Sequence, residues 1–345
     1  MNHGSTRGRA LVGLLVLAGL LATVAAAMYG WHALNLFSRS PLHVTTKAET
    51  IEIPPGTSFK RIIDDLRQRG VSDANPWYWR LLAERMRVAG RLHAGEYALS
   101  VGITPRQLLL NMANGKVLQH DFTIVDGWTF AELRQALAKA TKLKHDSVGL
   151  DAATIMQKIG APGVMPEGWF LPETYAYVKG DSDLDILKRA HRAMVKTLDA
   201  MWPGRDKNLP LATPYDALIL ASIVEKETGR ADERARIAGV FIRRLQMHML
   251  LQTDPSVIYG MGARYTGNIT KRDLTTDTPY NTYTRPGLPP TPIALPGKPA
   301  LEAALHPAPG KALYFVSMGN GRHIFADTLE EQNRNVNCYQ RKHCG

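Results

Sequence analysis

Cysteine is scarce in this chain: among 345 residues only Cys338 and Cys344 occur, both close to the last residue. Two cysteines exclude a disulfide-built scaffold, although a local disulfide between them is plausible. With His343 they supply two thiols and one imidazole, which is not a complete ligand set for zinc. We therefore expect no metal site.

Clustered basic charge is also lacking. The chain has 42 Lys and Arg against 31 Asp and Glu, a formal net charge of +11, but the basic residues are spread along its whole length. No nucleic-acid motif accompanies them, so we expect no nucleic-acid partner. Anionic partners such as lipid headgroups or an acidic polymer remain compatible with the charge.

Charge is missing altogether from Ala10 to Met28, a stretch about long enough to cross a bilayer. Arg7 and Arg9 precede it, and arginines on that side predict a cytoplasmic N-terminus. We predict a tail over 1–9, a transmembrane helix over 10–30 and a linker over 31–47, with the remainder in the periplasm. A cleaved signal peptide, with alanines at 25–27 as the cleavage site, is the alternative.

A threefold pattern follows in residues 48–140. The segments IEIPPGTSFKRIIDDL, YALSVGITPRQLLLNM and FTIVDGWTFAELRQAL align without gaps, each with a glycine followed two residues later by serine or threonine. Alternating apolar residues, a turn glycine, a capping hydroxyl and apolar residues at i, i+4 predict a strand, a turn and a capped helix. Such units resemble LysM-type modules, which bind N-acetylhexosamine chains; a purely structural role is the alternative.

A second domain is expected over 161–345. Thr213 and Pro214 start its most informative helix, which runs through ALILASIVEKET. Glu227 closes an apolar stripe at helical spacing, so its carboxyl should be partly desolvated and hold its proton near neutral pH. Glu225 lies about 200° away around the helix. It is the rival candidate, although it could simply be solvated beside Lys226.

Loops rich in proline and aromatic residues follow this helix in the sequence, at 251–262, 279–297 and 304–316. They offer hydrogen-bonding groups and flat faces, a mixture suited to a polyol substrate. The predicted substrate-binding residues are Gln252, Asp254, Tyr259, Tyr280, Asn281 and Tyr283.

The chain resembles the endolytic murein transglycosylases, the YceG-like or MltG family. The resemblance rests on the N-terminal span and on EGWFLPETY, ASIVEKET, LQTDPSVIYGMG, YNTY, GLPPTPIALPG and HPA followed by YFV. It implies an α+β chain with a transmembrane helix, a LysM-like α+β subdomain and a mixed α/β catalytic domain. It also implies an inner-membrane lyase that cuts the MurNAc-GlcNAc bond of nascent peptidoglycan strands, leaves 1,6-anhydroMurNAc ends and terminates elongation.

By the same resemblance Glu227 is the catalytic acid/base, no cofactor is needed, and peptidoglycan synthases (penicillin-binding proteins) are partners. One carboxylate suffices for lytic cleavage, whereas hydrolases of either stereochemistry use two. If the chain is instead a muramidase, Asp254 is the expected second carboxylate. A non-catalytic, membrane-tethered scaffold that binds the cell wall is the other alternative.

Overall fold

The computed structural model describes residues 5–45 and 49–341, and those residues divide into two compact units that meet between His120 and Asp121. Mixed α+β structure is present in both, with one N-terminal apolar helix long enough to cross a membrane. The described strands form three two-stranded sheets.

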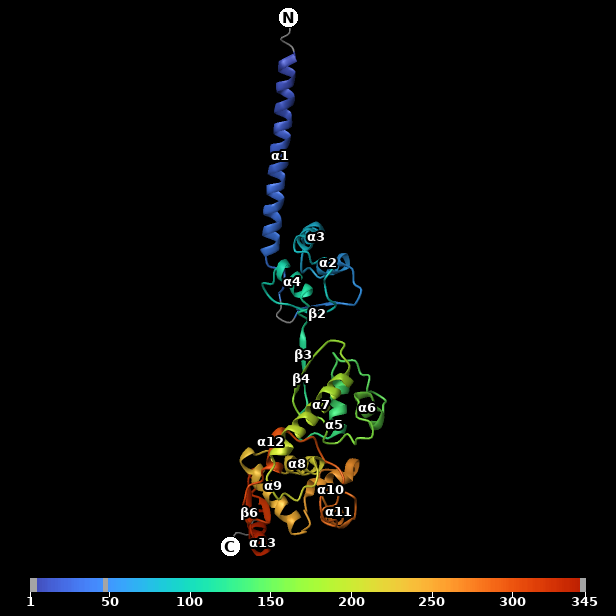
Figure 1. Cartoon of the computed structure of the whole chain (residues 1–345), viewed down its shortest axis with the longest axis vertical. Helices are drawn as coiled ribbons and strands as arrows, with labels where there is room; N and C mark the ends of the chain where they lie inside the picture. The colour runs from blue at the N-terminus through green and yellow to red at the C-terminus, as the bar shows by residue number, and fades with distance from the viewer. Residues whose placement is uncertain (1–4, 46–48, 342–345) are drawn as a thin grey trace. The chain divides into compact units, whose positions relative to one another are not determined.

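The first unit begins with α1, Ser5–Arg39, which is one unbroken helix (Figure 1). The chain then forms β1, Glu49–Ile53, and β2, Gly95–Leu99, which pair antiparallel with Ile51 opposite Tyr97. Three helices pack on this pair and on the end of α1: α2 Phe59–Gln68, α3 Pro76–Arg85 and α4 Pro105–Ala113. Leu34 of α1 is buried in the core of this unit, so the helix enters the unit directly where we expected a linker.

The repeated sequence pattern is confirmed as local structure. Gly56, Gly102 and Gly127 all have positive φ, between 78° and 85°, which glycine adopts without the cost of a Cβ clash. Two residues later Ser58, Thr104 and Thr129 each accept a backbone N–H and cap α2, α4 and α5.

The three repeats do not share one unit. The third consists of β3, Gln119–Thr123, and α5, Phe130–Lys139, and the side chains of α5 pack with the second unit. The expected subdomain over 48–140 therefore crosses the division at residue 120. Leu133 and Leu137 of α5 lie in one core with Phe170 and Ile186, which explains why the third repeat belongs to the second unit.

The second unit also contains β4 Thr174–Val178, which pairs with β3, and the hairpin of β5 Tyr314–Ser317 with β6 His323–Ala326. Its remaining helices are α6 Ala152–Ile159, α7 Asp183–Met201, α8 Pro214–Glu227, α9 Ala231–Gln246, α10 Asp254–Met261, α11 Lys271–Thr275, α12 Lys298–Leu305 and α13 Leu329–Tyr339. Because α6 packs in the same core as α5 and α7, this unit starts before residue 161. Cys338 in α13 is disulfide-bonded, while Cys344 lies outside the described residues.

Candidate active site

Helix α8 is the centre of the second unit. Thr213 and Asp216 form a reciprocal capping box and Pro214 occupies the first turn, as the sequence predicted. Every residue from Ala217 to Val224 is buried, so the helix is covered on all sides and its apolar stripe is wider than expected. A helix packed in this way holds the side chains at its C-terminal end in fixed positions.

Glu225 is tied into the fold. Its Oε2 accepts the N–H of Gly297 at 3.0 Å, and its Oε1 lies 3.6 Å from Nη2 of Arg234. Burial raises the pKa of Glu225, and the N–H of Gly297 opposes that rise. The expectation that Glu225 could be solvated beside Lys226 is wrong, since only 5% of its side chain is exposed. The reason is that α9 and the loop before α12 cover this side of α8.

Glu227 faces a different neighbour, as the helical spacing predicted. Its Oε1 accepts a short hydrogen bond from the hydroxyl of Thr253, and no other hydrogen bond links its carboxylate to the described residues. Burial raises the pKa of Glu227 to about 7. The Thr253 hydroxyl opposes that rise, the charge of Asp254 adds to it, and Arg244 opposes it. Near neutral pH this carboxyl can therefore both donate and accept a proton.

Thr253, the hydrogen-bond partner of Glu227, is an exception among the threonines at helix N-caps. Thr253 is the N-cap residue of α10, yet its side chain makes no capping bond to that helix. The other threonines at N-caps of described α-helices all cap with their hydroxyls: Thr104, Thr129, Thr213, Thr270 and Thr328. The hydroxyl of Thr253 is instead directed at Glu227, while its N–H donates to Oγ1 of Thr282 at 3.0 Å.

Gln252 is held just before that cap. Its φ of +50° is unusual for a residue with a side chain, and its N–H donates to the carbonyl of Thr282 at 3.1 Å. The buried guanidinium of Arg244 donates to the carbonyl of Leu251 at 2.9 Å and to Oε1 of Gln252 at 3.2 Å. Arg244 therefore fixes the strained segment that carries Thr253.

Asp254 and Tyr283 form a second polar pair beside Glu227. The hydroxyl of Tyr283 donates to Oδ1 of Asp254 at 2.5 Å. Burial and the hydrogen bond to Asp254 raise the pKa of Tyr283, so it stays protonated as a donor. Asp254 itself is exposed and opens α10, where the helix dipole favours a negative charge.

We predicted no site role for Glu167, which the structure shows as a third acid desolvated by burial. Its Oε1 accepts the N–H of Phe130 at 3.0 Å, and its Oε2 accepts the hydroxyl of Tyr259 at 3.1 Å. Burial raises the pKa of Glu167 to about 7, against these hydrogen bonds. The ring of Tyr259 also meets Tyr280 edge to face at 4.9 Å. In the sequence, the signal for Glu167 was that it is the one acid in the largely apolar segment EGWFLP.

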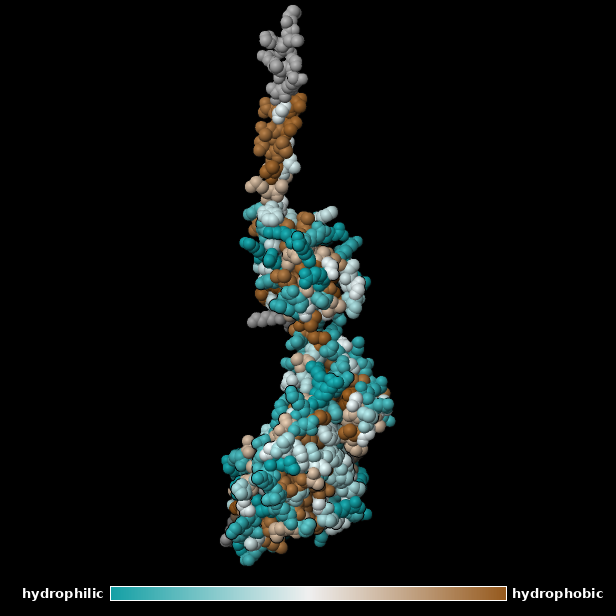
Figure 2. Space-filling model, in the orientation of Figure 1, coloured by the Kyte–Doolittle hydropathy of each residue, from teal (hydrophilic) through white to brown (hydrophobic). Residues whose placement is uncertain are grey.

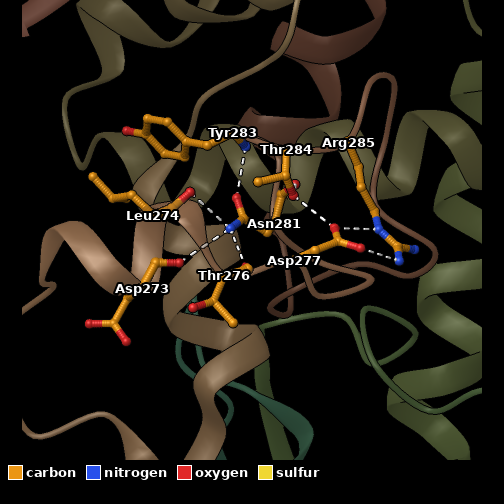
Figure 3. Close-up of polar contacts among 8 residues, drawn as sticks. All are labelled: Asp273, Leu274, Thr276, Asp277, Asn281, Tyr283, Thr284 and Arg285. Atoms are coloured by element: carbon orange, nitrogen blue, oxygen red, sulfur yellow. Dashed lines mark hydrogen bonds and ion pairs between the residues drawn. The ribbon is translucent and has the colours of Figure 1, made fainter.

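Asn281 is not placed to touch a substrate. It is fully buried, and its Nδ2 donates to the carbonyls of Asp273, Leu274 and Thr276 (Figure 3). Its Oδ1 accepts the N–H of Tyr283 at 2.9 Å. Figure 3 shows the amide at the centre of this loop, with an Arg285 to Asp277 ion pair beside it. In this structure Asn281 braces the loop that carries Tyr283.

Fold and site together define an α+β protein with an apolar N-terminal helix and a helix-borne glutamate poised for acid/base chemistry. The chain belongs to the YceG-like family, whose model matches residues 51–338. A Bacillus subtilis relative named endolytic murein transglycosylase is 30% identical over 302 residues, which cover 82% of each chain. A Streptococcus pneumoniae relative with the same name is 25% identical over 351 residues, and the match covers 92% of this chain but 63% of that longer protein. The crystal structure of a YceG-like protein from Listeria monocytogenes matches 84% of this chain and all of that one, with 30% identity and a TM-score of 0.52.

Proposed function

We propose that this chain is an endolytic murein transglycosylase, a lyase that cuts peptidoglycan glycan strands without water, with Glu227 as its acid/base. The observation that carries the proposal is the raised pKa of Glu227, about 7, at the end of a fully packed helix. General acid/base groups work best when their pKa lies near the operating pH. The relatives' shared name supports peptidoglycan as the substrate.

The proposed reaction needs only one carboxyl group. Protonated Glu227 gives its proton to the glycosidic oxygen as the bond to C1 of N-acetylmuramic acid breaks. The carboxylate then takes the proton of the 6-hydroxyl of the same sugar while O6 bonds to C1. The product is a 1,6-anhydro end, and Glu227 regains its proton. Since Thr253 occupies Oε1, we assign the proton transfers to Oε2.

The other acids of the site are engaged elsewhere. Glu225 is bound by Arg234 and Gly297, and Glu167 by Phe130 and Tyr259. Asp254 directly follows Thr253, the hydrogen-bond partner of Glu227. It would be the second carboxylate if the enzyme were a hydrolase. Its hydrogen bond from Tyr283 gives it a positioning role in the lytic reaction.

The test is digestion of purified glycan strands by the full chain. We expect 1,6-anhydro-muramyl ends from the wild type and a fall of about 10² to 10⁴ in rate for Glu227→Gln. Glu225→Gln is the matched control and should retain activity. Reducing muramyl ends that carry oxygen from water would show that the chain is a muramidase instead. If the wild type produced no new ends, only the non-catalytic scaffold that binds the cell wall would remain. Activity lost in Glu225→Gln but kept in Glu227→Gln would move the acid to Glu225.

For the first unit we propose a LysM-like role in holding the glycan. The segments from β1 to α4 are two strand-turn-helix units around one antiparallel pair, and a hollow beside β1 and α2 is lined by Thr57, Arg61 and Gln68. These groups offer donors and acceptors to sugar hydroxyls. Arg61→Ala should weaken retention of the full chain on insoluble peptidoglycan; unchanged retention would argue against the role.

For the anchor we propose a single inner-membrane span with a cytoplasmic N-terminus, on the strength of Arg7 and Arg9 and the charge-free stretch after them. A reporter active only outside the cytoplasm, fused after residue 45, should be active. An inactive reporter would reverse the orientation.

We also propose that the enzyme terminates elongating strands beside peptidoglycan synthases such as penicillin-binding proteins. An endolytic cutter held at the membrane would meet strands as they emerge. Cells producing only Glu227→Gln should then make longer strands than the wild type, and equal lengths would contradict termination.

A further inference from the structure

The two ends of α3 contact α1 at different heights. On the buried face, Trp79 lies edge to face with Phe37 at 5.2 Å, and Tyr78 lies 5.6 Å from the same ring. On the exposed face, Arg85 donates to Oδ1 of Asn35 at 2.7 Å, and its guanidinium lies 4.0 Å above the ring of Trp31. Residues 31 and 37 are about 9 Å apart along a helix axis at 1.5 Å per residue. The C-terminal end of α3, where Arg85 lies, is therefore the end turned toward the N-terminal part of α1.

That part of α1 is the apolar candidate span. Figure 2 shows it as a column of apolar side chains above the rest of the first unit. A hydrocarbon core of about 30 Å takes up about 20 helical residues, which from Leu11 reach Gly30. Trp31 would then lie at the boundary with the headgroups, and so would the Arg85 stacked on it.

The exposed face of α3 carries side chains suited to that layer. Trp77, Leu81 and Arg85 follow one another at i, i+4 spacing and share one line on the helix. Trp77 is 65% exposed and Leu81 is 47% exposed, although both are large and apolar. Arg80 lies over the ring of Trp77. Glu84 is the one acid in α3, against the two arginines Arg80 and Arg85, so the helix favours an anionic surface.

We propose that this outer face of α3, defined by Trp77, Arg80, Leu81 and Arg85, lies in the headgroup layer of the bilayer that α1 spans. The indole and leucine enter the interface, and the arginines contact lipid phosphates. The proposal rests on the anchor proposed above. It makes the first unit a fixed extension of the membrane helix, because Leu34, Phe37 and Asn35 join the two directly.

The test uses the full chain in nanodiscs of phosphatidylethanolamine and phosphatidylglycerol that contain a lipid with a nitroxide on its headgroup. Such a quencher reports tryptophans at headgroup depth, and the chain has six tryptophans in all. If Trp31 and Trp77 are the two at that depth, Trp77→Phe should remove about half of the quenched signal. Trp77 is exposed, so its substitution leaves the core intact.

Trp202→Phe, in the second unit, is the matched control and should leave the quenched signal unchanged. A Trp77→Phe result equal to this control overturns the proposal, because Trp77 would then be open to water or to a protein partner. Trp31→Phe separates this failure from failure of the anchor. If α1 spans the bilayer, Trp31→Phe lowers the quenched signal whatever α3 does. If it does not, neither Trp31→Phe nor Trp77→Phe lowers the signal, and both proposals fall.

Discussion

Replacing Thr253 by valine tests the assignment of Glu227 most directly. Valine keeps the branched shape in a position that is 1% exposed, but it removes the hydroxyl that donates to Oε1 of Glu227. The hydroxyl stabilises the ionised carboxylate, since its hydrogen bond lowers the pKa of Glu227. Its removal must therefore raise that pKa further above about 7.

The size of the effect follows from the bond that is lost. A hydrogen bond to a charged group contributes about 1.5 to 3 kcal/mol. At 1.36 kcal/mol for each tenfold change, the pKa of Glu227 should rise by about one to two pH units. Asp254 and Arg244, the charged groups that face the carboxyl, and Tyr283 beside Asp254 are unchanged in the variant.

The assay is the rate of anhydro-end formation as a function of pH. On the proposed mechanism cleavage needs protonated Glu227, so the alkaline limb of kcat/KM should fall near pH 7 in the wild type and about one to two pH units higher in Thr253→Val. The maximum rate should drop, because the carboxyl loses the group that orients it. Thr253→Ser keeps the hydroxyl and should restore the wild-type limb. A limb that stays in place in Thr253→Val would refute the reasoning.

Three further outcomes are expected. Glu227→Gln should be more stable than the wild type by about 1 kcal/mol at pH 5 and by about 3 kcal/mol at pH 8 in urea unfolding. The reason is that a folded pKa of about 7, above an unfolded value near 4.5, costs stability as the pH rises through that window; an equal gap at both pH values would contradict the desolvated site. Glu225→Gln should lose about 1 to 3 kcal/mol, because Arg234 then lacks its charged partner. No loss would show that the pair contributes little. Asn281→Ala should lose about 2 to 4 kcal/mol and raise KM, since the loop carrying Tyr283 loses its brace; an unchanged unfolding midpoint would count against that role.

Local structure was predictable wherever the signals were themselves local. The glycine and hydroxyl spacing in the repeat predicted three turns and three caps, and all three formed. The division between the units was not predictable in this way. It depends on Leu133 and Leu137 finding Phe170 and Ile186, which are far along the chain, and nothing in the spacing of the repeat identifies those partners.

The site shows the same limit. Helical spacing placed Glu225 and Glu227 on different sides of α8, but the Glu225 partner Gly297 is 72 residues away and left no mark in the helix sequence. Thr253 could not have been assigned either, because Thr-Asp-Pro is an ordinary helix start whose hydroxyl is expected to cap. Asn281 was predicted to bind substrate because amides bind sugars. The structure shows instead that Asn281 is buried and that its amide makes its hydrogen bonds to the backbone of its own loop.

The placement of Glu227 conflicts with helix energetics, and that conflict argues for a function. It is the last residue of α8, where the partial negative charge of the helix C-terminus disfavours a carboxylate. Desolvation acts in the same direction, and so does Asp254. The hydroxyl of Thr253 donates a hydrogen bond to Glu227, which opposes this rise in pKa, and therefore does not cap α10. Glutamine could accept that hydrogen bond without the cost of a buried charge, so stability alone would not select an acid here. A group that must give and retake a proton near neutral pH requires this balance, and the surrounding contacts hold its pKa there.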